Sequence, residues 1–467
     1  MFESAREAID YIKRNEIEAV DLKACDLQGR WKHVTLPASG VTERTLAEGV
    51  GCDGSNYGLK GVGSSDMILK PDCSTAFRDP FWDMPVLSFI CGIHETDDVE
   101  SPCRYDPRRI CEAAEKRLLS LGAGDRIELG PEYEFYVFDG VSFENSPLRT
   151  GFEITVKGNG NGANGHAPAA KGAYHAEQPS DRHASFRGRL CRIIENMGVR
   201  VKYHHHEVGG HGQLEIETAF GPPVEMGDAT MKIKYAVKNF AAACGMTATF
   251  MPKPIFGEPG SGLHVHFKMF REGRPVFSDP KGYSGVSAEA LSFITGILRN
   301  SRSLSAFANP SINSYKRLVR GYEAPIAAVF AAGNRSAAVR IPGYAKRPED
   351  ARFEYRAGDA TANPYLMFAS LIMAGAEGLR LRLRPEDENA GPAEGNVFEM
   401  RGMEESGIRL LPACLQEAAE ALEKSHSYLT ESGVFPEGLV KFWAESKRAE
   451  SIVAAPQPIE YELYYDI

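Results

Sequence analysis

The stretch GPEYEFYVF, from Gly130 to Phe138, decides how the rest of this sequence is interpreted. It is rich in aromatic residues and alternates with a period of two, which is typical of a β-strand whose side chains point to opposite faces in turn. Glu132 and Glu134 are therefore predicted to lie on one face of that strand. Two carboxylates on one face provide the oxygen ligands that a hard divalent cation prefers.

A second stretch, GSGLHVH from Gly260 to His266, places His264 and His266 on one face for the same reason. Glu207 and Glu215 stand in strand-like runs joined by a segment that contains a Gly-Gly pair. A hairpin would bring both carboxylates to one point. Each of these glutamates alone would more often be a solvated surface residue, but together with the first strand they predict a metal site.

Glu354 and Arg356 alternate in the run FEYR and are predicted to share a face. This pattern fits a carboxylate ligand beside an anion-binding guanidinium, and it also fits an ordinary cross-strand ion pair. The histidine triplet His204–His206 invites a zinc interpretation, but in a strand His205 points away from its two neighbours. One histidine with five carboxylates suits magnesium or manganese better than zinc or copper.

Five arginines within forty residues would serve an anionic substrate: Arg317, Arg335, Arg340, Arg352 and Arg356. Arginines that flank an apolar strand suggest bidentate capture of a carboxylate or a phosphate. A solvated basic face explains the same arginines equally well. The chain has no Walker phosphate loop, no Gly-x-Gly-x-x-Gly after a strand and no kinase signature. If it uses ATP, metals and arginines are predicted to hold the phosphates.

Two loop-like segments carry carboxylates that fit proton transfer. Asn313–Pro325 is typical of a loop that closes over a ligand, with Glu323 near its tip. Asp53 opens the segment DGSNYG, which ends at Gly58 and fits a plain turn equally well. Carboxylates on such loops, near metals and arginines, are consistent with proton abstraction and lid closure.

The composition, 43% apolar and 25% charged over 467 residues, is that of an ordinary globular protein. The length predicts two domains, which we expect to span residues 1–103 and 104–467. The net charge of -10 disfavours nucleic acid or an anionic membrane as a partner. The nine cysteines contain no CxxC pair, no apolar run reaches the length of a membrane span, and the N-terminus is unlike a signal peptide. We therefore expect a cytoplasmic protein with reduced thiols.

Strands and helices alternate irregularly, which predicts an α+β fold with a mainly antiparallel sheet rather than regular βαβ units. Strands are expected at 17–25 and 84–93, and helices at 4–15, 107–121, 178–197, 228–244, 288–308, 364–383 and 411–432. Residues 157–173 are rich in glycine and asparagine and are expected to form a mobile loop. Residues 459–467 alternate apolar and acidic residues, which predicts a docked terminal strand, with another subunit as one candidate for the docking surface.

The motifs of this chain occur in the order typical of one family. They are DGS at 53–55, SDM at 65–67, PD at 71–72, DPF at 79–81, GPE at 130–132, KGxY at 171–174, HHHE at 204–207, MPKP at 251–254 and the segment 313–325. With these motifs the chain resembles bacterial type I glutamine synthetase over nearly its whole length. The resemblance implies an N-terminal β-grasp domain and a catalytic domain in which a curved antiparallel sheet forms a funnel-shaped active site. It also implies a dodecamer of two hexameric rings, in which Asp53 completes the active site of a neighbouring subunit.

The resemblance further implies a role for each candidate residue. Two magnesium or manganese ions would be held, the first by Glu134, Glu207 and Glu215, and the second, on the ATP phosphates, by Glu132, His264 and Glu354. Substrates would be bound by Gly260, Arg317 and Arg356 (glutamate), by His266, Arg340 and Arg352 (ATP), and by Asp53, Tyr174 and Glu207 (ammonium). Arg335 would stabilise the transferring phosphoryl group, Asp53 would take a proton from ammonium, and Glu323 would shield the intermediate from water and help deprotonate the tetrahedral adduct.

The implied reaction is the ATP-dependent condensation of L-glutamate with ammonia to glutamine. The γ-carboxylate attacks the γ-phosphate of ATP to give γ-glutamyl phosphate, and ammonia then displaces phosphate. Metals and arginines balance the negative charge that accumulates during phosphoryl transfer.

Several positions depart from the family pattern. The family's asparagine in the glycine-rich glutamate loop is Pro259, which offers neither an amide side chain nor a backbone donor. Asn56 replaces a serine beside the expected ammonium site, and Lys268 replaces a serine near the nucleotide. In the flap, Arg320 replaces a proline. Phe398 replaces the tyrosine that is adenylylated in regulated members, so that form of control is expected to be absent.

These departures permit a γ-glutamyl ligase that uses a small amine, such as methylamine, a polyamine or ethanolamine, in place of ammonia. A non-catalytic scaffold of the same fold is a third hypothesis, and it predicts binding of ATP or metal without phosphate release. Glutamine synthesis is favoured, because Asp53, Tyr174 and Glu207, the groups expected to hold a cation, are all present.

Overall fold

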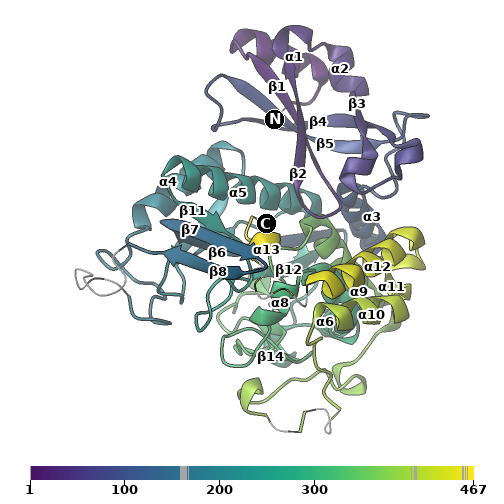
Figure 1. The fold of residues 1–467 in the computed structure, drawn as a ribbon. Coiled ribbons are helices and arrows are strands. Elements are labelled where there is room, and N and C mark those ends of the chain that lie inside the picture. The colour runs from purple at the N-terminus through teal and green to yellow at the C-terminus, as the bar shows by residue number, and fades with distance from the viewer. Residues whose placement is uncertain are drawn as a thin grey trace.

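The computed structural model of this chain describes residues 2–157, 166, 168–400, 402–403, 407–454, 457, 459 and 461–466. Within them, a small N-terminal sheet with its own helices stands beside a larger unit built on a curved sheet (Figure 1). The expected division between residues 103 and 104 falls between the last strand of the first sheet and the first helix of the second unit, and it stays our proposal for the domain boundary. None of the helices in the described part of the chain is long and apolar enough to cross a membrane.

The N-terminal unit has the order of a β-grasp. Its strands lie in the order β2-β1-β5-β4-β3, with β1 and β5 parallel and the other pairs antiparallel. Their bounds are β1 Ala19–Cys25, β2 Trp31–Pro37, β3 Val50–Asp53, β4 Asp66–Arg78 and β5 Val86–His94, with helices α1 Ala5–Arg14 and α2 Glu43–Glu48. The side chain of Ser4 accepts from the backbone N–H of Glu7 and caps α1, which confirms the first predicted helix.

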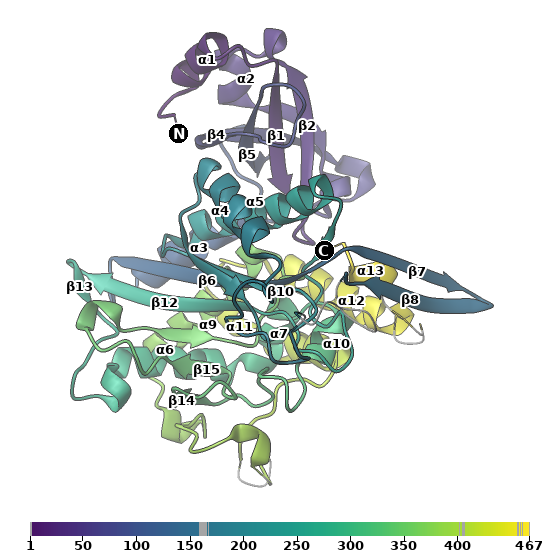
Figure 2. The same ribbon diagram turned by 90° about the vertical axis from the view of Figure 1, so that its left-hand side faces the viewer.

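The larger sheet is mainly antiparallel, as predicted. Its main path runs β14-β15-β16-β12-β6-β10-β9, and only the pairing of β14 with β15 is parallel among the described pairs of this sheet. The bounds are β6 Arg126–Phe138, β9 Val201–His206, β10 Gln213–Thr218, β11 Thr247–Thr249, β12 Leu263–Arg271, β13 Arg274–Pro275, β14 Phe330–Ala332, β15 Val339–Ile341 and β16 Phe353–Tyr355. β6 and β12 lie side by side through the middle of this unit (Figure 2).

Helices cover one face of this sheet and leave the other face for polar side chains. The odd-numbered aromatic residues of β6 point into the core, where the hydroxyl of Tyr133 lies 3.0 Å from that of Thr230 on α5. The bounds are α3 Pro107–Leu119, α4 Ala184–Asn196, α5 Pro223–Ala243, α6 Ala288–Arg299, α7 Ser301–Ala308, α8 Ile312–Arg317, α9 Pro364–Leu381, α10 Leu415–Lys424, α11 Ser427–Thr430 and α12 Glu437–Ala454. The predicted helix at 288–308 is two helices, which break at Asn300, and the one expected at 411–432 is also two.

An ion-pair network joins the two units. Arg108, near the start of α3, donates to Asp228 on α5 through Nε and Nη2, each at 3.0 Å, and to Asp72 on β4 at 2.8 Å. Asp228 also accepts a hydrogen bond from Tyr365. Because Asp228 is buried, Arg108 is the partner that balances its carboxylate.

The C-terminal prediction was wrong in its secondary structure. The structure has a short helix, α13 (Tyr461–Tyr464), in place of the expected strand. Its Tyr461 stacks on Phe152 of the hairpin formed by β7 (Gly140–Ser146) and β8 (Arg149–Thr155), with ring centroids 4.1 Å apart, and Thr249 donates to the carbonyl of Tyr465. One helical turn places the tyrosines on the same side, so the end docks on its own chain. Within the predicted loop, residues 158–165 and 167 lie outside the described residues.

Candidate active site

The polar face of the larger sheet is a grid of acidic and basic side chains whose order follows from strand register. Reading across the strands, the first row is His205, Glu215, Glu134; the second is Tyr203, Glu217, Glu132, His264; the third is Gly130, His266, Glu354, Arg340. The period of two along β6, β10 and β12 therefore places all of these residues on one face. The predictions that Glu132 and Glu134 share a face, and that Glu207 and Glu215 meet through a hairpin, are confirmed.

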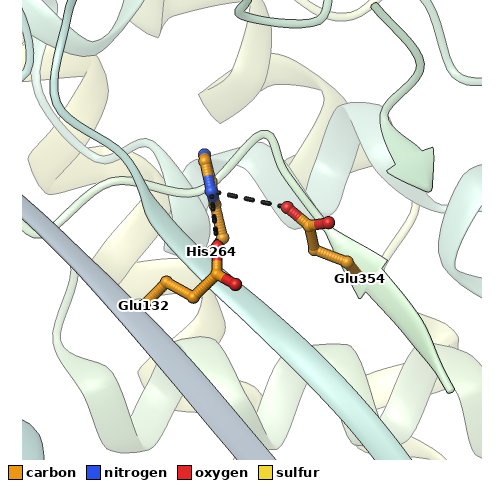
Figure 3. A group of neighbouring side chains, drawn as sticks. All are labelled: Glu132, His264 and Glu354. Atoms are coloured by element: carbon orange, nitrogen blue, oxygen red, sulfur yellow. Dashed lines mark hydrogen bonds and ion pairs between the residues drawn. The ribbon is translucent and has the colours of Figure 1, made fainter. Parts of the chain in front are cut away.

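Glu132, His264 and Glu354 form the first group that could hold a cation (Figure 3). Nδ1 of His264 lies 3.2 Å from Oε2 of Glu132 and 3.5 Å from Oε1 of Glu354. All three residues are buried, and they come from β6, β12 and β16. Two carboxylates and one imidazole, converging in this way, are the donor set that magnesium or manganese accepts.

Glu354 is held ionised by two guanidinium groups. Nη1 of Arg356 donates to Oε1 of Glu354 at 2.6 Å, and Nε of Arg340 donates to Oε2. Although burial opposes ionisation, the charges of Arg356 and then Arg340 lower the pKa of Glu354 to about 2. The cross-strand ion pair that competed with the metal interpretation is thus present, and the same carboxylate still faces His264.

A second group consists of His205, Glu207 and Glu215. The nitrogens of His205 lie 3.6 Å from Oε2 of Glu207 and 3.5 Å from Oε2 of Glu215. Burial, followed by the charge of Glu134, raises the pKa of Glu207 to about 8, and burial raises that of Glu215 as well. Oε2 of Glu207 is buried and has no hydrogen-bond partner among the described residues. An unsatisfied carboxylate oxygen among other carboxylates fits a divalent cation as the missing partner.

Glu134 was predicted to hold the first ion together with Glu207 and Glu215. Its carboxylate is instead hydrogen-bonded to the backbone. Its Oε2 accepts from the backbone N–H of Gly262 at 2.5 Å, while the side chain still lines both cavities of the site. The structure therefore brings Glu207 and Glu215 together with His205, and it places Glu134 beside them.

Two adjoining cavities lie over the grid. The larger, of about 530 Å³, is lined by the acidic side chains and by arginine and tyrosine residues that include Arg340 and Tyr344. The smaller, of about 160 Å³, is lined by Lys171, Gly260 and Arg317 among others. Both share the lining residues Glu134, His264, Arg335 and Arg356. Shared cationic walls suit a reaction in which negative charge passes from one bound molecule to another.

Arg317 forms the wall of the smaller cavity. Its guanidinium is buried and donates to the carbonyls of Ala357 and Gly358, at 2.9 and 3.2 Å, and it lies 3.3 Å from Nε2 of His264. Gly260 packs against it so closely that an added Cβ would lie 2.7 Å from Cγ of Arg317. Only glycine permits this approach.

Glu323, which lines the smaller cavity, and Tyr174, which lines the larger, both approach Arg335, which lines both. Glu323 sits in the left-handed backbone region with φ of 60°, and its Oε2 lies 3.9 Å from Nη1 of Arg335. Arg335 in turn reaches the hydroxyl of Tyr174 at 3.5 Å. Nη2 of Arg356 donates to the backbone carbonyl of Glu323 at 3.3 Å. The predicted lid loop is therefore attached to both arginines.

Arg352 and His266 lie behind residues that line the larger cavity, and neither lines it directly. Arg352 lies over the ring of Tyr344 at 5.3 Å and donates to the carbonyl of Asp350. Nε2 of His266 lies 2.6 Å from Oε1 of Glu132. Lys268, one of the departures, lies over the ring of Phe220 at 4.6 Å.

Four of the predicted site residues do not line either cavity: Asp53, His266, Arg352 and Glu354. Of these, Asp53 belongs to the other sheet. It ends β3 in the N-terminal sheet, apart from β6 and β12 (Figure 1). Its carboxylate accepts hydrogen bonds from Ser55 and, at 2.8 Å, from the side chain of Asn56, and these bonds lower its pKa. Asn56, which the sequence comparison with the resembled family singled out, therefore donates to the carboxylate of Asp53.

Three members of the candidate metal groups were not among the predicted metal ligands: His205, Glu217 and His266. The side chain of His205 was expected to point away from those of His204 and His206. It faces Glu207 and Glu215. Glu217 follows Glu215 with a period of two, so the alternation used for Glu132 and Glu134 would have placed it on the same face.

Comparisons with known proteins agree with this arrangement. Residues 16–96 match the family "Glutamine synthetase, beta-Grasp domain" and residues 104–464 match "Glutamine synthetase, catalytic domain". Proteins named glutamine synthetase from Azotobacter vinelandii and Pseudomonas aeruginosa are 40% and 41% identical over 471 and 468 residues, which cover 98% of this chain and 99% and 98% of those proteins. A protein named 3-hydroxylaminophenol mutase, from Cupriavidus pinatubonensis, is 38% identical over 483 residues, the whole length of both chains.

Solved structures agree on the fold. A glutamine synthetase from Plasmodium falciparum has a TM-score of 0.85 at 24% identity, covering 99% of both chains. A structure described as a GmaS/ADP complex has a TM-score of 0.80 at 24% identity, covering 97% of both chains. Because both family domains match and relatives at about 40% identity span nearly the full length, the chain is an enzyme of the glutamine synthetase family.

Proposed function

We propose that this enzyme condenses L-glutamate with ammonia to form glutamine, using ATP and passing through γ-glutamyl phosphate. The observation that carries the proposal is the pair of adjoining cavities, which share Glu134, His264, Arg335 and Arg356 over two groups of cation ligands. The smaller cavity limits its occupant to a molecule of amino-acid size. The larger, lined by carboxylates and arginines, suits a metal-bound triphosphate.

We assign the smaller cavity to glutamate. Gly260 and Arg356 line it and the buried Arg317 forms its wall, so the substrate carboxylates would meet guanidinium groups with little competing water. Pro259 also lines this cavity, and its carbonyl accepts from Tyr136 at 2.7 Å. The hydrogen bond expected from an asparagine side chain at this position would have to come from another group.

We assign the larger cavity to the triphosphate. Glu132, His264 and Glu354 would hold one divalent ion, and His205, Glu207 and Glu215, with Glu134 beside them, would hold the other. Such ions supply charge neutralisation to the phosphates and to the developing acyl phosphate. Arg340 and Arg352 would orient the nucleotide, whereas His266, expected to bind it too, is fully buried against Glu132. Arg335 would bind the transferring phosphoryl group, because it lies on the wall shared by both cavities.

We assign the ammonium site to Tyr174 and Glu207, completed by Asp53 of a neighbouring subunit. Asp53 of the same chain is exposed on the N-terminal sheet and outside both cavities, which is what a shared site in the proposed dodecamer requires. Asp53 would take a proton from ammonium, and Glu323 on its loop would keep water from the acyl phosphate and help deprotonate the adduct.

The test is phosphate release by the purified protein with ATP, magnesium and glutamate, comparing ammonium with methylamine, a polyamine and ethanolamine. Turnover with ammonium at least equal to that with each amine is expected. Turnover with an amine alone would make the chain a γ-glutamylamide ligase. No phosphate release with any nucleophile would favour the scaffold, provided that ATP or metal still binds.

A further inference from the structure

Glu217 lies in the second row of the grid and has no part in the proposed function. Its side chain is 1% exposed, and it stands directly opposite Glu132 in the antiparallel pairing of β10 with β6. Oε1 accepts from Nζ of Lys202 at 2.5 Å. Oε2 is buried and makes no hydrogen bond of ordinary geometry among the residues that the structure describes, and the hydroxyl of Tyr203, opposite on β9, interacts with this carboxylate.

Two carboxylates directly opposite each other on neighbouring strands repel, and burial strengthens that repulsion. Lys202 supplies one positive charge to Glu217 and leaves Oε2 of that carboxylate without a hydrogen bond of ordinary geometry within the described chain. His266 is the third member of the group, with Nε2 at 2.6 Å from Oε1 of Glu132. One ligand atom from each of Glu132, Glu217 and His266 lies within 4.8 Å of the others, and none of the three residues is more than 7% exposed.

We propose that Glu132, Glu217 and His266 form a third site for a divalent cation, of the magnesium or manganese class. Glu132 would bridge this ion and the one held with His264 and Glu354, since it belongs to both groups of ligand atoms. The proposal rests on the proposed function only for the identity of that neighbouring ion. Two carboxylates and one imidazole are the same donor set as in the neighbouring group.

The third ion would be structural. Glu132 lines the larger cavity, whereas Glu217 and His266 do not, so the site lies beneath the cavity floor and is closed by Glu132. An ion enclosed in this way neutralises the facing carboxylates of β6 and β10 and exchanges slowly. It would be present without nucleotide or glutamate.

The test measures how many Mn²⁺ ions each chain of the full-length protein binds when neither ATP nor glutamate is present. Equilibrium dialysis followed by elemental analysis gives this number. Glu217→Gln is expected to hold one ion fewer than the wild type. Two variants serve as matched controls and should keep the wild-type number: Lys202→Met, which removes only the ion-pair partner, and Glu128→Gln, which removes a carboxylate from the same face of β6. An equal number in Glu217→Gln and the wild type would overturn the proposal.

A second measurement applies to the wild type alone, in case Glu217→Gln does not fold or disturbs the neighbouring ion. Anomalous scattering from Mn²⁺-soaked crystals is expected to show a peak at about 2.2 Å from both Glu217 and His266. Crystals that show the other ions and no density there would refute the site. Neither measurement involves turnover, so failure of the ammonium assay would leave this inference standing.

Discussion

Replacing Glu207 by glutamine is expected to make the metal-free protein more stable at alkaline pH, although it removes a proposed metal ligand. Glu207 is 5% exposed, and burial together with the charge of Glu134 raises its pKa to about 8, against 4.5 for an ordinary glutamate. Between these two pH values the folded state binds a proton that the unfolded state has lost. The corresponding stability is fully present below about pH 4.5 and is lost as the pH rises through 8.

The magnitude follows from the two pKa values. A rise from 4.5 to about 8 corresponds to about 5 kcal/mol in all, since each pKa unit corresponds to about 1.4 kcal/mol. Between pH 6 and pH 8, Glu207 is expected to lose about 2 kcal/mol of its contribution to the free energy of unfolding. Glu215, whose pKa is raised by burial in the same direction, adds to the loss in the wild type.

The assay is chemical denaturation in the presence of EDTA at pH 6 and pH 8, and then with Mn²⁺. In EDTA the wild type should weaken from pH 6 to pH 8 by about 2 kcal/mol more than Glu207→Gln. With Mn²⁺ the order should reverse, because the variant lacks one carboxylate ligand. Glu128→Gln, on the same face of β6 but outside the ligand groups, should follow the wild type throughout. If wild type and Glu207→Gln show the same pH dependence in EDTA, the reasoning is wrong.

Three further outcomes are expected. Glu323→Ala should lower glutamine formation more than phosphate release, because water would reach the acyl phosphate; a phosphate-to-glutamine ratio that stays at the wild-type value would contradict the shielding role. Gly130→Ala should lower the free energy of unfolding, measured in urea, by about 1–3 kcal/mol. The reason is that the new Cβ would lie 2.9 Å from the phenyl ring of Phe220. Gly188→Ala, in a helix with open space around the new methyl group, should instead stabilise by roughly 0.5–1 kcal/mol. Asp228→Asn should lower the free energy of unfolding by roughly 3 kcal/mol, because it leaves the largely buried guanidinium of Arg108 without this partner. Glu48→Gln, in the exposed pair with Arg44, should change it by less than about 1 kcal/mol. Equal effects of the two substitutions would refute this difference between buried and exposed ion pairs.

The sequence was most informative where a strict alternation met chemically unusual residues. In β6 the period of two placed Glu132 and Glu134 on one face, and the same rule for β12 placed His264 and His266 there. The hairpin of β9 and β10 followed from a Gly-Gly turn between strand-like runs. Which strands become neighbours is set by long-range packing, so the meeting of β16 with β12 could not be read from periodicity.

Other features had no decisive local signal. The end of the chain fits both a strand and a single helical turn, and docking of Tyr461 on Phe152 decides between them. The region 288–308 has a continuous helical pattern, but the backbone leaves the helix at Asn300, whose side chain donates to Glu377. That Asp53 lies outside the cavities of its own chain depends on how the N-terminal unit sits on the larger one, which its motif does not encode.

The strand β6 also poses a problem during synthesis that its glutamates help to solve. Its partners in the sheet are made later, β10 about 80 residues and β12 about 130 residues further along the chain. Until then GPEYEFYVF is an aromatic, β-prone segment with both edges unpaired, which is the kind of sequence that associates with other nascent chains. Glu132 and Glu134 give it two negative charges in the middle and so act as gatekeepers against aggregation. The carboxylates proposed to serve the metals in the finished enzyme would thus protect the unfinished polypeptide first.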